Sequence, residues 1–425
     1  MNRRWLAVAL MVVAVRAGAQ PGGVRIGLTY APGVKPGVVV ALSSGVLGDS
    51  VSAIVARDLD FGDRVTVIAA GATLAPATTL GKSPNYALLA KLGAAGLVQL
   101  EVSGGRVRAT VHDVGAQRVI DTTSAGLPAG GPTRAWRSVV HRVADDVERV
   151  LTGTAGIAHS RIAYVKAGRT WVVDSDGAFP EAISDGSALS PAWRRDGGAL
   201  AWTTLTSSGS RIQIKELGSG RLQSLVATPD GLNITPVFSA DGSALVYAHG
   251  LENGTDLWIA PVAGGEARRV TVGRGSDNTS PTVSPDGRRV AFTSGRTGHP
   301  DLYVADLDGT NTDALTDIGL DEDSYRAGPD WSGDGRAIAF GTRVGGQFQV
   351  AVLFLRDRAV KVLTSEAKNE DPSWAPDGRH LVFTSTRTGA PELWVVDSES
   401  GRVRQLTRDR GSRLAAWSPR LPATP

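Results

Sequence analysis

The sequence predicts a multidomain protein in which a small N-terminal α/β domain is followed by a six-bladed all-β propeller. Three observations carry this prediction. A unit of about 45 residues repeats through the second half of the chain, mixed helix and strand patterns fill the region before it, and part of a unit stands at each end of the repeats. With 425 residues, 42% of them hydrophobic, the chain is long enough for two or three domains with buried cores.

The first residues have the pattern of a cleavable export signal. Arg3 and Arg4 precede an apolar run from Trp5 to Val15, and Ala17-Gly18-Ala19 supplies the small residues that cleavage requires. The run is shorter than the roughly 20 residues that span a bilayer, so neither a retained anchor nor direct membrane insertion is expected. We predict that residues 1–19 are a signal peptide.

Composition excludes several classes of function. Of the 45 basic residues, three arginines lie in the signal, so the mature chain carries 42 basic and 42 acidic residues and is close to neutral. Such a balance gives no reason to expect a nucleic-acid or membrane-surface partner. The chain contains no cysteine, which excludes a disulfide framework and a thiolate metal site.

The region before Gly153 alternates between the periods of strands and helices. Strand-like runs occupy residues 37–42, 65–68, 97–102, 107–111 and 118–122, and helical spacing occupies residues 47–59 and 84–92. Thr133 is placed to cap a long helix with Trp136, Val140 and Val147 on its apolar face. We predict one compact α/β domain over residues 20–153.

The repeated unit has an aromatic or apolar residue, then Asp-Gly three positions later, then an apolar strand. Its aspartates are 45, 45, 48 and 43 residues apart, at Asp196, Asp241, Asp286, Asp334 and Asp377. The Ser-Pro-Asp-Gly version of the motif suits a type I turn. A third, alternating strand and a weaker fourth strand ending in Leu-Thr complete each unit, which is the size of a propeller blade.

The two ends of the repeat region predict how the ring closes. Ala415 to Pro419 reads as a sixth inner strand, and Arg161 to Val165 reads as a second strand that lacks a first strand before it. If these two strands pair, six blades are complete and two exposed sheet edges disappear. We therefore assign residues 154–425 to a six-bladed propeller.

These features together resemble the TolB family, the periplasmic propeller proteins of the Tol–Pal cell-envelope system. The resemblance rests on Val24-Arg25-Ile26 near the mature start, on Leu151-Thr152-Gly153 followed by the strand at Arg161, and on the terminal Ala-Trp-Ser-Pro. The order of signal, α/β domain, junction and six blades is more specific than any single repeat. Departures from the pattern occur at Arg194-Arg195, Val283 and Ser332-Gly333, where they alter individual turns.

The resemblance implies a function in protein docking. A TolB-like chain is expected to be a periplasmic monomer that binds the peptidoglycan-associated lipoprotein Pal and supports outer-membrane integrity, cell division and protein import. It is expected to contact TolA through its mature N-terminal segment. In this chain that segment is Gln20 to Tyr30, which Ala31-Pro32-Gly33 separates from the α/β domain, so we expect it to be a mobile or add-on strand that serves a partner rather than part of the core.

Catalytic and metal-binding motifs are absent from the sequence. There is no Gly-x-Ser-x-Gly elbow, no His-Glu-x-x-His and no phosphate-binding loop ending in Lys-Ser/Thr. His141 lies beside the apolar face of the long helix, where partial burial is expected. Asp306 opens a calcium-like segment, but Asn311 replaces the required glycine and Asp317 the required glutamate. We expect no enzyme activity, no metal and no cofactor.

The alternative to a docking protein is a propeller-type carbohydrate-binding module or lyase. That function needs acid/base or stacking residues that point into the channel, and sequence does not position them. A binding screen against polysaccharides, run beside capture from an envelope extract, discriminates between the two.

The candidate partner-binding residues lie in the loops that lead into the inner strands. Such loops gather at one mouth of a propeller and are held on a rigid scaffold. The set comprises Leu232, Asn233, Thr235, Asp277, Asn278, Thr279, Ser280, Asn369, Glu370 and Asp371. The resemblance matches Leu232, Thr235, Thr279 and Ser280 to Pal-docking positions of the family, of which Leu232 and Ser280 depart from the family pattern.

Overall fold

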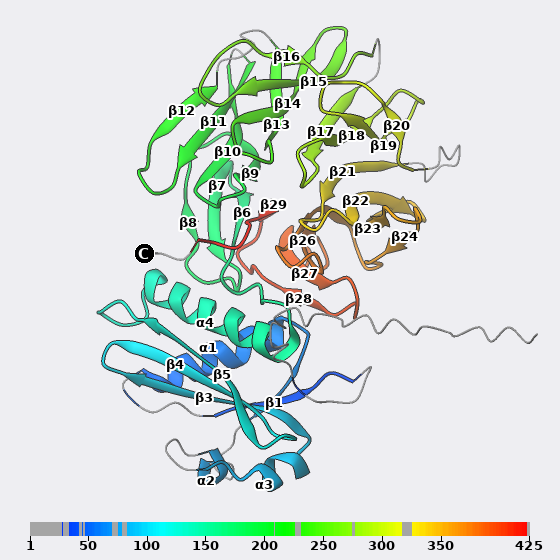
Figure 1. Cartoon of the computed structure of the whole chain (residues 1–425). Coiled ribbons are helices and arrows are strands. Elements are labelled where there is room, and N and C mark those ends of the chain that lie inside the picture. Colours follow the sequence, from blue (N-terminus) through cyan, green and yellow to red (C-terminus); the bar gives the residue numbers. More distant parts are fainter. Residues whose placement is uncertain are drawn as a thin grey trace, which may run out of the picture.

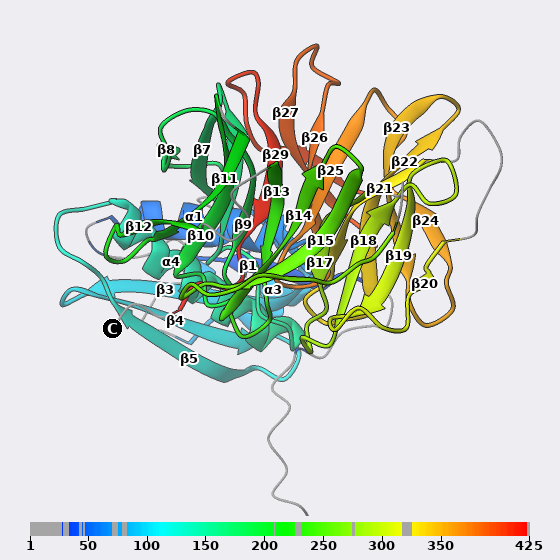
Figure 2. The same ribbon diagram turned by 90° about the horizontal axis from the view of Figure 1, so that it is seen from above.

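The computed structural model describes residues 28, 34–41, 45, 47–69, 75–78, 83–207, 209–225, 231–273, 277–316 and 325–422. The predicted signal peptide, residues 1–19, lies outside the described residues. Figure 1 shows the α/β domain beside a ring of β-sheets, and Figure 2 shows the same ring turned by 90°. The predicted fold class is confirmed by this arrangement.

The α/β domain contains one five-stranded sheet with the order β2-β1-β3-β4-β5. β1 runs parallel to both of its neighbours, and β3, β4 and β5 form antiparallel pairs. Its elements are β1 (Gly37–Val40), α1 (Gly48–Phe61), β2 (Thr66–Ile68), α2 (Ala75–Thr78), α3 (Tyr86–Lys91), β3 (Ala94–Ser103), β4 (Arg106–Asp113), β5 (Arg118–Gly126) and α4 (Arg134–Thr152).

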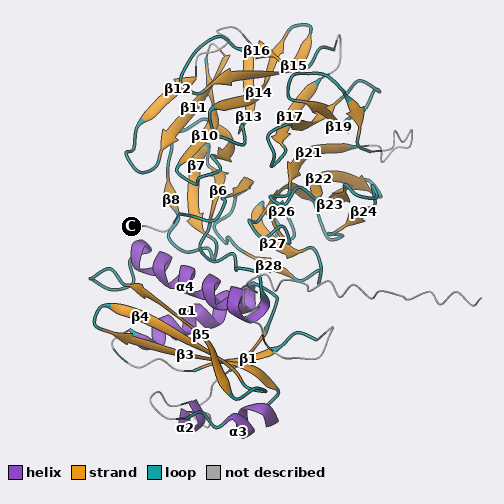
Figure 3. Ribbon diagram, in the orientation of Figure 1, coloured by secondary structure: helices purple, strands orange, loops and turns teal. Residues whose placement is uncertain are grey.

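The long helix α4 forms for the reasons its sequence suggests. The Thr133 hydroxyl accepts a hydrogen bond from the Trp136 amide, and Gly153 ends the helix in the left-handed region with φ of 82°. The apolar faces of α4 and α1 pack together on one side of the sheet, while α3 packs on the other side. Both long helices therefore lie between the sheet and the propeller (Figure 3).

Leu28 belongs to this core. It is buried and its side chain lies against Gly96 beside Leu151. The expectation that residues 20–30 stand apart from the core is therefore wrong for Leu28. The rest of that segment lies outside the described residues.

The propeller consists of six four-stranded sheets, which we number as blades 1 to 6. Blade 1 contains β9 (Ala188–Trp193), β10 (Ala199–Thr206), β11 (Gly209–Glu216) and β12 (Leu222–Leu225), and blade 2 contains β13 (Leu232–Phe238), β14 (Ala244–Leu251), β15 (Gly254–Pro261) and β16 (Arg268–Arg269). Blade 3 contains β17 (Asn278–Val283), β18 (Arg289–Ser294), β19 (Asp301–Asp306) and β20 (Asp313–Ala314). Blade 4 contains β21 (Arg326–Trp331), β22 (Ala337–Val344), β23 (Gln347–Phe354) and β24 (Val360–Val362).

The last two blades complete the ring. Blade 5 contains β25 (Asn369–Trp374), β26 (His380–Ser385), β27 (Glu392–Asp397) and β28 (Val403–Gln405), and blade 6 contains β29 (Arg413–Trp417), β6 (Arg161–Lys166), β7 (Arg169–Asp174) and β8 (Glu181–Ala182). In blade 6 the pairs Ala416–Ala163 and Trp417–Ile162 join β29 to β6. The predicted closure by strands from both ends of the repeat region is confirmed.

The repeated Asp-Gly segments form the expected turns. In blade 2, the Gly242 amide donates to the Ser239 carbonyl at 2.9 Å, and the Asp241 carboxylate accepts from Ser239 Oγ and the Ser243 amide. Where Arg194 replaces the serine, its guanidinium binds Asp196 and Glu216 instead. A charged pair thus takes the place of the hydroxyl, and the turn keeps its shape.

The α/β domain contacts blades 5 and 6 on the face that carries these turns. The propeller residues that it contacts include Asp176, between β7 and β8, and Asp377, between β25 and β26. In an antiparallel four-stranded blade the turn between strands one and two and that between strands three and four lie at the same end. The opposite end of the propeller, where the inner strands begin, therefore faces away from the α/β domain. Among the described residues, no helix is long and apolar enough to cross a membrane.

Candidate functional site

The inner strands of the six blades enclose a central cavity of about 550 Å³. Prolines and aromatic residues of these strands form much of its lining. Its ionisable lining residues are Arg195, Asp330 and Asp371. We name its two ends the strand-start mouth, where the inner strands begin, and the turn mouth, where the Asp-Gly turns lie.

Each inner strand is bent at the same point. The residue there has a positive φ between 47° and 63°, and the pairing with the second strand shifts register beside it. The six residues are Ser190, Thr235, Ser280, Gly328, Asp371 and Leu414. A proline follows five of them, which suits a bulge because proline has no N–H to pair. Thr235, Ser280 and Asp371 of the predicted set therefore shape the channel wall.

Side chains along the channel join each blade to the next. Thr235 Oγ1 accepts from the Ser280 amide at 3.3 Å, and Asp330 Oδ2 accepts from the Trp374 amide at 2.7 Å. Burial raises the pKa of Asp330 to about 6, against the effect of that amide. Within blade 5, Asp371 accepts from Thr384 Oγ1 at 3.3 Å, and burial raises its pKa to about 6. Both carboxyl groups thus serve joints between strands.

The three predicted asparagines are buried and structural. Asn278 and Asn369 are 0% exposed, and Asn233 is 7% exposed. The Asn278 amide donates to Asp256 Oδ1 at 2.9 Å, and the Asn369 amide donates to Gln349 Oε1 at 2.8 Å, each across to the preceding blade. Their side chains are therefore not accessible to a partner.

The neighbours of these asparagines remain accessible. Leu232 is 48% exposed and Asp277 is exposed, while Thr279, Ser280 and Glu370 are half-buried. These five side chains surround the strand-start mouth on blades 2, 3 and 5. The predicted loop placement is wrong for nine of the ten residues, which lie within β13, β17 and β25, whereas Asp277 precedes its strand. The structure therefore divides the predicted set into accessible residues and residues that hold the blades together.

A side pocket of about 370 Å³ beside Glu370 and Asp371 was missed by sequence reasoning. Lys368 contributes its ammonium group, which lies 2.9 Å from the Glu370 carboxylate, and Arg413 and Leu414 contribute from blade 6. Alignment of the repeats was a usable signal, because Arg413 and Leu414 precede Ala-Ala-Trp as Glu370 and Asp371 precede Pro-Ser-Trp.

A repeated spacing also marks the buried joints. In blades 2 to 5, a residue near the start of the third strand is followed 15 positions later by the threonine of a Leu-Thr or Val-Thr pair. In blade 2 these are Asp256 and Thr271, whose hydroxyl donates to Asp256 Oδ1 at 2.7 Å, the same atom that Asn278 binds. Where an asparagine begins the next inner strand, at Asn278 and Asn369, this spacing predicts its burial.

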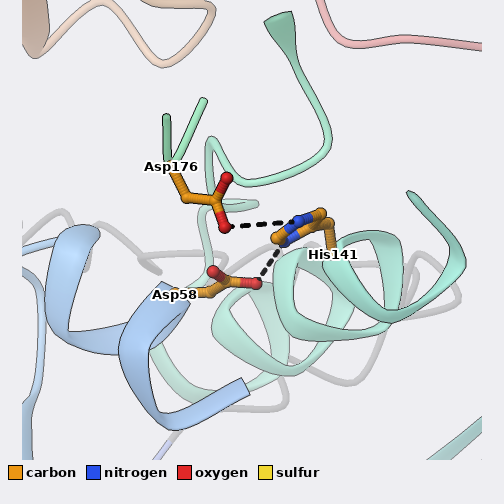
Figure 4. A group of neighbouring side chains, drawn as sticks. All are labelled: Asp58, His141 and Asp176. Carbon is orange, nitrogen blue, oxygen red and sulfur yellow. Dashed lines mark hydrogen bonds and ion pairs between the residues drawn. The ribbon is translucent and has the colours of Figure 1, made fainter. Parts of the chain in front are cut away.

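Two groups, each made of two aspartates and one histidine, lie between the domains. Within each group the side chains are close enough together to suggest metal ligands. They are Asp58, His141 and Asp176, and Asp63, His380 and Asp397, with ligand atoms within 4.8 Å of one another. Figure 4 shows His141 between the two aspartates of the first group. Arg57 and Arg137 already contact Asp176 Oδ2, and Arg379 binds Asp397. Cationic side chains thus occupy the positions a metal needs, and we assign both groups as ion-pair networks.

Comparisons with known proteins agree with this geometry. Residues 148–421 match the family model described as the TolB beta propeller domain. The Tol-Pal system protein TolB of Methylococcus capsulatus is 33% identical over 242 residues, which are 53% of this chain and 55% of that protein. The TolB of Cereibacter sphaeroides strain ATCC 17025 is 29% identical over 53% of this chain and 54% of that protein. The chain thus spans about half the length of the curated relatives it matches.

A solved structure extends the likeness to the whole fold. The crystal structure of TolB from Acinetobacter baumannii superimposes with a TM-score of 0.77 at 23% identity, covering 92% of this chain and 98% of that one. This match includes the α/β domain as well as the propeller.

Proposed function

The chain belongs to the TolB β-propeller family, and from this premise we propose that it is a periplasmic protein-docking component of the Tol–Pal envelope system. Its proposed partners are the lipoprotein Pal, at the strand-start mouth, and TolA, through the mature N-terminal segment. In this role the chain acts as a monomer that supports outer-membrane integrity and cell division, and it performs no catalytic step.

One observation supports docking at the strand-start mouth above others. The α/β domain contacts the opposite face of the propeller, so this mouth keeps its half-buried and exposed side chains. Leu232, the first residue of β13, and Asp277, just before β17, lie exposed there beside the buried joints of Asn233 and Asn278. Residues held in this way present a preformed surface, which lowers the ordering cost of binding.

The ionisable channel residues favour binding over acid/base chemistry. A lyase needs a carboxylic acid or base that is free to reach its substrate. Asp330 and Asp371 instead accept hydrogen bonds from neighbouring strands. We therefore prefer the docking function to the carbohydrate lyase.

The test is a titration of the purified mature chain with purified Pal-type lipoprotein domain. Thr279→Ile adds bulk to a half-buried position on the mouth and should weaken capture by about 1 kcal/mol or more, as for a central interface residue. Thr122→Ile, on the exposed edge strand β5, is the matched control and should bind normally. Equal binding by the wild type, Thr279→Ile and a Thr235/Thr279 double variant would place the partner on another face.

A further inference from the structure

The joint between the two domains is made of charged groups. In the part of the chain that the structure describes, each cluster of buried apolar residues lies within the α/β domain or within the propeller and its linker. Ion pairs cross between them instead. The crossing pairs are Arg57–Asp176, Arg137–Asp176, Arg134–Asp174, Arg134–Glu181, Arg64–Asp377, Arg402–Asp60 and Arg402–Asp63.

The first centre of this joint is His141, on α4. Its Nδ1 lies 2.6 Å from Asp58 Oδ2 of α1, and its Nε2 lies 3.8 Å from Asp176 Oδ2 of the propeller (Figure 4). An imidazole carries a hydrogen on both nitrogens only when it is protonated. Nε2 also lies 3.5 Å from Arg137 Nη2, whose charge opposes protonation. The two carboxylates outweigh this one guanidinium, so the site favours the cation, and the cation links the two domains.

The second centre, His380 of blade 5, has the reverse arrangement. Its Nδ1 lies 2.8 Å from Asp377 Oδ2 of its own turn, and its Nε2 lies 3.7 Å from Asp63 Oδ2 of the α/β domain. Arg64 extends the cluster, with Nη2 at 3.0 Å from Asp377 and Nε at 3.4 Å from Glu148 Oε1. Here the propeller supplies the imidazole and the α/β domain the distant carboxylate.

Both histidines are stabilised as cations despite burial. Burial lowers the pKa of His141, but Asp58 and then Asp176 raise it above the usual value overall. Burial likewise lowers the pKa of His380, and Asp377 and Asp63 raise it overall. The side chains of His141 and His380 are only 2% and 1% exposed, so water does not replace a lost partner.

Other charged groups face these centres from every neighbouring element. Around His141 they are Asp58 and Arg57 of α1, Arg137 of α4, His159 of the linker, and Asp174 and Asp176 of blade 6. Around His380 they are Asp63 and Arg64 after α1, Glu148 of α4, and Asp377, Arg379, Asp397 and Arg402 of blade 5. Burial lowers the pKa of His159 to about 4, so this third histidine stays neutral across the physiological range.

We propose that His141 and His380 are two proton-dependent clamps that hold the α/β domain on blades 5 and 6. Loss of the proton from either imidazole leaves the carboxylates on both sides of it facing each other in a buried joint. The clamps therefore loosen as pH rises, while each domain keeps its own apolar core. Domain docking, rather than folding of either domain, is the proton-sensitive step.

The direction of the pH effect follows from which pKa values are raised on folding and which are lowered. A histidine whose pKa is raised on folding contributes stability below its unfolded value of about 6.5 and loses it as pH rises through the folded value. Glu148, whose pKa burial raises to about 8, acts in the same direction. The pKa of Asp176 and that of Asp63 are lowered against the effect of burial by their cationic neighbours, so these groups weaken the joint only in acid, below about pH 4. The histidine clamps should be tightest between about pH 4 and 6.5, while the contribution of Glu148 declines between about pH 4.5 and 8.

The test measures the distance between the domains as a function of pH. The chain has no cysteine, so labels can be placed at Ser103→Cys on β3 and Ser219→Cys after β11, which are both exposed. Double electron–electron resonance from pH 5.5 to 9.5 should show one narrow distance at low pH and a broad distribution above the folded histidine pKa values. Circular dichroism should show unchanged secondary structure over this transition.

Substitutions test whether the two histidines cause the pH-dependent broadening of the distance between the domains. His141→Gln with His380→Gln should broaden the distances already at pH 6, whereas His112→Gln, a buried histidine bonded to Gln99 within the α/β domain, should behave as the wild type. Should the double variant fail to fold, Asp176→Asn in the wild-type background should lower the His141 pKa, as read from histidine NMR signals, and move the transition to lower pH. A narrow distance that persists to pH 9.5 in the wild type, or a transition unchanged by these substitutions, overturns the proposal.

Discussion

The two faces of the propeller use polar side chains in opposite ways. On the turn face, charged side chains such as Asp176 and Asp377 are buried against a second domain and paired with its cations. On the strand-start face, the buried polar side chains, such as Asn278, bind within the propeller, and their neighbours Asp277 and Thr279 are left accessible.

This difference shows that the same repeat can support two kinds of joint. Neighbouring blades share buried apolar clusters, to which amide, hydroxyl and carboxyl hydrogen bonds and ion pairs such as Arg326–Asp301 are added. Bonds between domains use complete ion pairs, which depend on protonation and salt. We therefore expect the ring to be the robust unit and the domain joint the adjustable one.

The largest expected effect comes from opening the ring. Deleting the residues after Leu414 removes Trp417, which is 5% exposed and donates from Nε1 to Ser160 Oγ at 2.8 Å. The loss of this buried aromatic residue and of the strand pairing should lower the free energy of unfolding by about 3–5 kcal/mol. Chemical denaturation checks this, with a chain ending at Pro422 as the control. An unchanged midpoint would contradict closure through β29.

A pair of adjacent residues tests the division within the strand-start face. Asn278→Ala removes the bond to Asp256 and leaves a buried acceptor with one partner fewer, which should cost about 2 kcal/mol of stability. Asp277→Ala, one position earlier and exposed, should change stability by less than about 0.5 kcal/mol. Thermal denaturation of the two variants checks the contrast, and equal losses would refute it.

Most of the fold was predictable from sequence because each blade repeats its own local signals. The period of the Asp-Gly turns placed the blades, and the unpaired strand at Arg161 predicted the closure that β29 completes. The turn at Arg194-Arg195 kept its shape although its sequence departs from the repeat, because the Arg194 guanidinium donates to Asp196 in place of the missing hydroxyl and is itself held by Glu216.

The candidate site was predictable only in part. Asn278 and Asp277 are both polar loop residues in the sequence, and only the packing of the preceding blade decides that one is buried and the other exposed. The domain joint was not predictable, because His141 meets Asp58 from 83 positions away and Asp176 from another domain. The apolar stripe of α4 favoured partial burial of His141, whereas its side chain is almost wholly buried between carboxylates.

A substitution at Glu148 tests whether the domain joint depends on pH. Burial, and then the neighbouring Asp145 carboxyl, raises the pKa of Glu148 to about 8. Wild-type stability should therefore fall as pH rises through about 8, because the ionised carboxylate is buried. Glu148→Gln stays neutral and should lose about 1–2 kcal/mol less between pH 6 and pH 9. Urea denaturation at both pH values checks this, with Glu252→Gln on the exposed turn of blade 2 as the control.

The smallest expected effect on stability is at Leu232, and it bears on the proposed docking. Leu232 is 48% exposed at the rim of the strand-start mouth, beside Leu251 at 57%. Leu232→Ala should leave the melting temperature almost unchanged, because a side chain that is half in water loses little on truncation. If the rim receives an apolar part of a partner, the same change should weaken lipoprotein capture by about 1 kcal/mol, since burial on binding is then lost. Val360→Ala, at 52% exposure on the outer edge of blade 4, is matched in exposure and lies away from the mouth. Calorimetric titration of both variants separates the two positions: equal affinities would show that the rim leucine makes no contact, and a loss confined to Leu232→Ala would place the partner over blade 2.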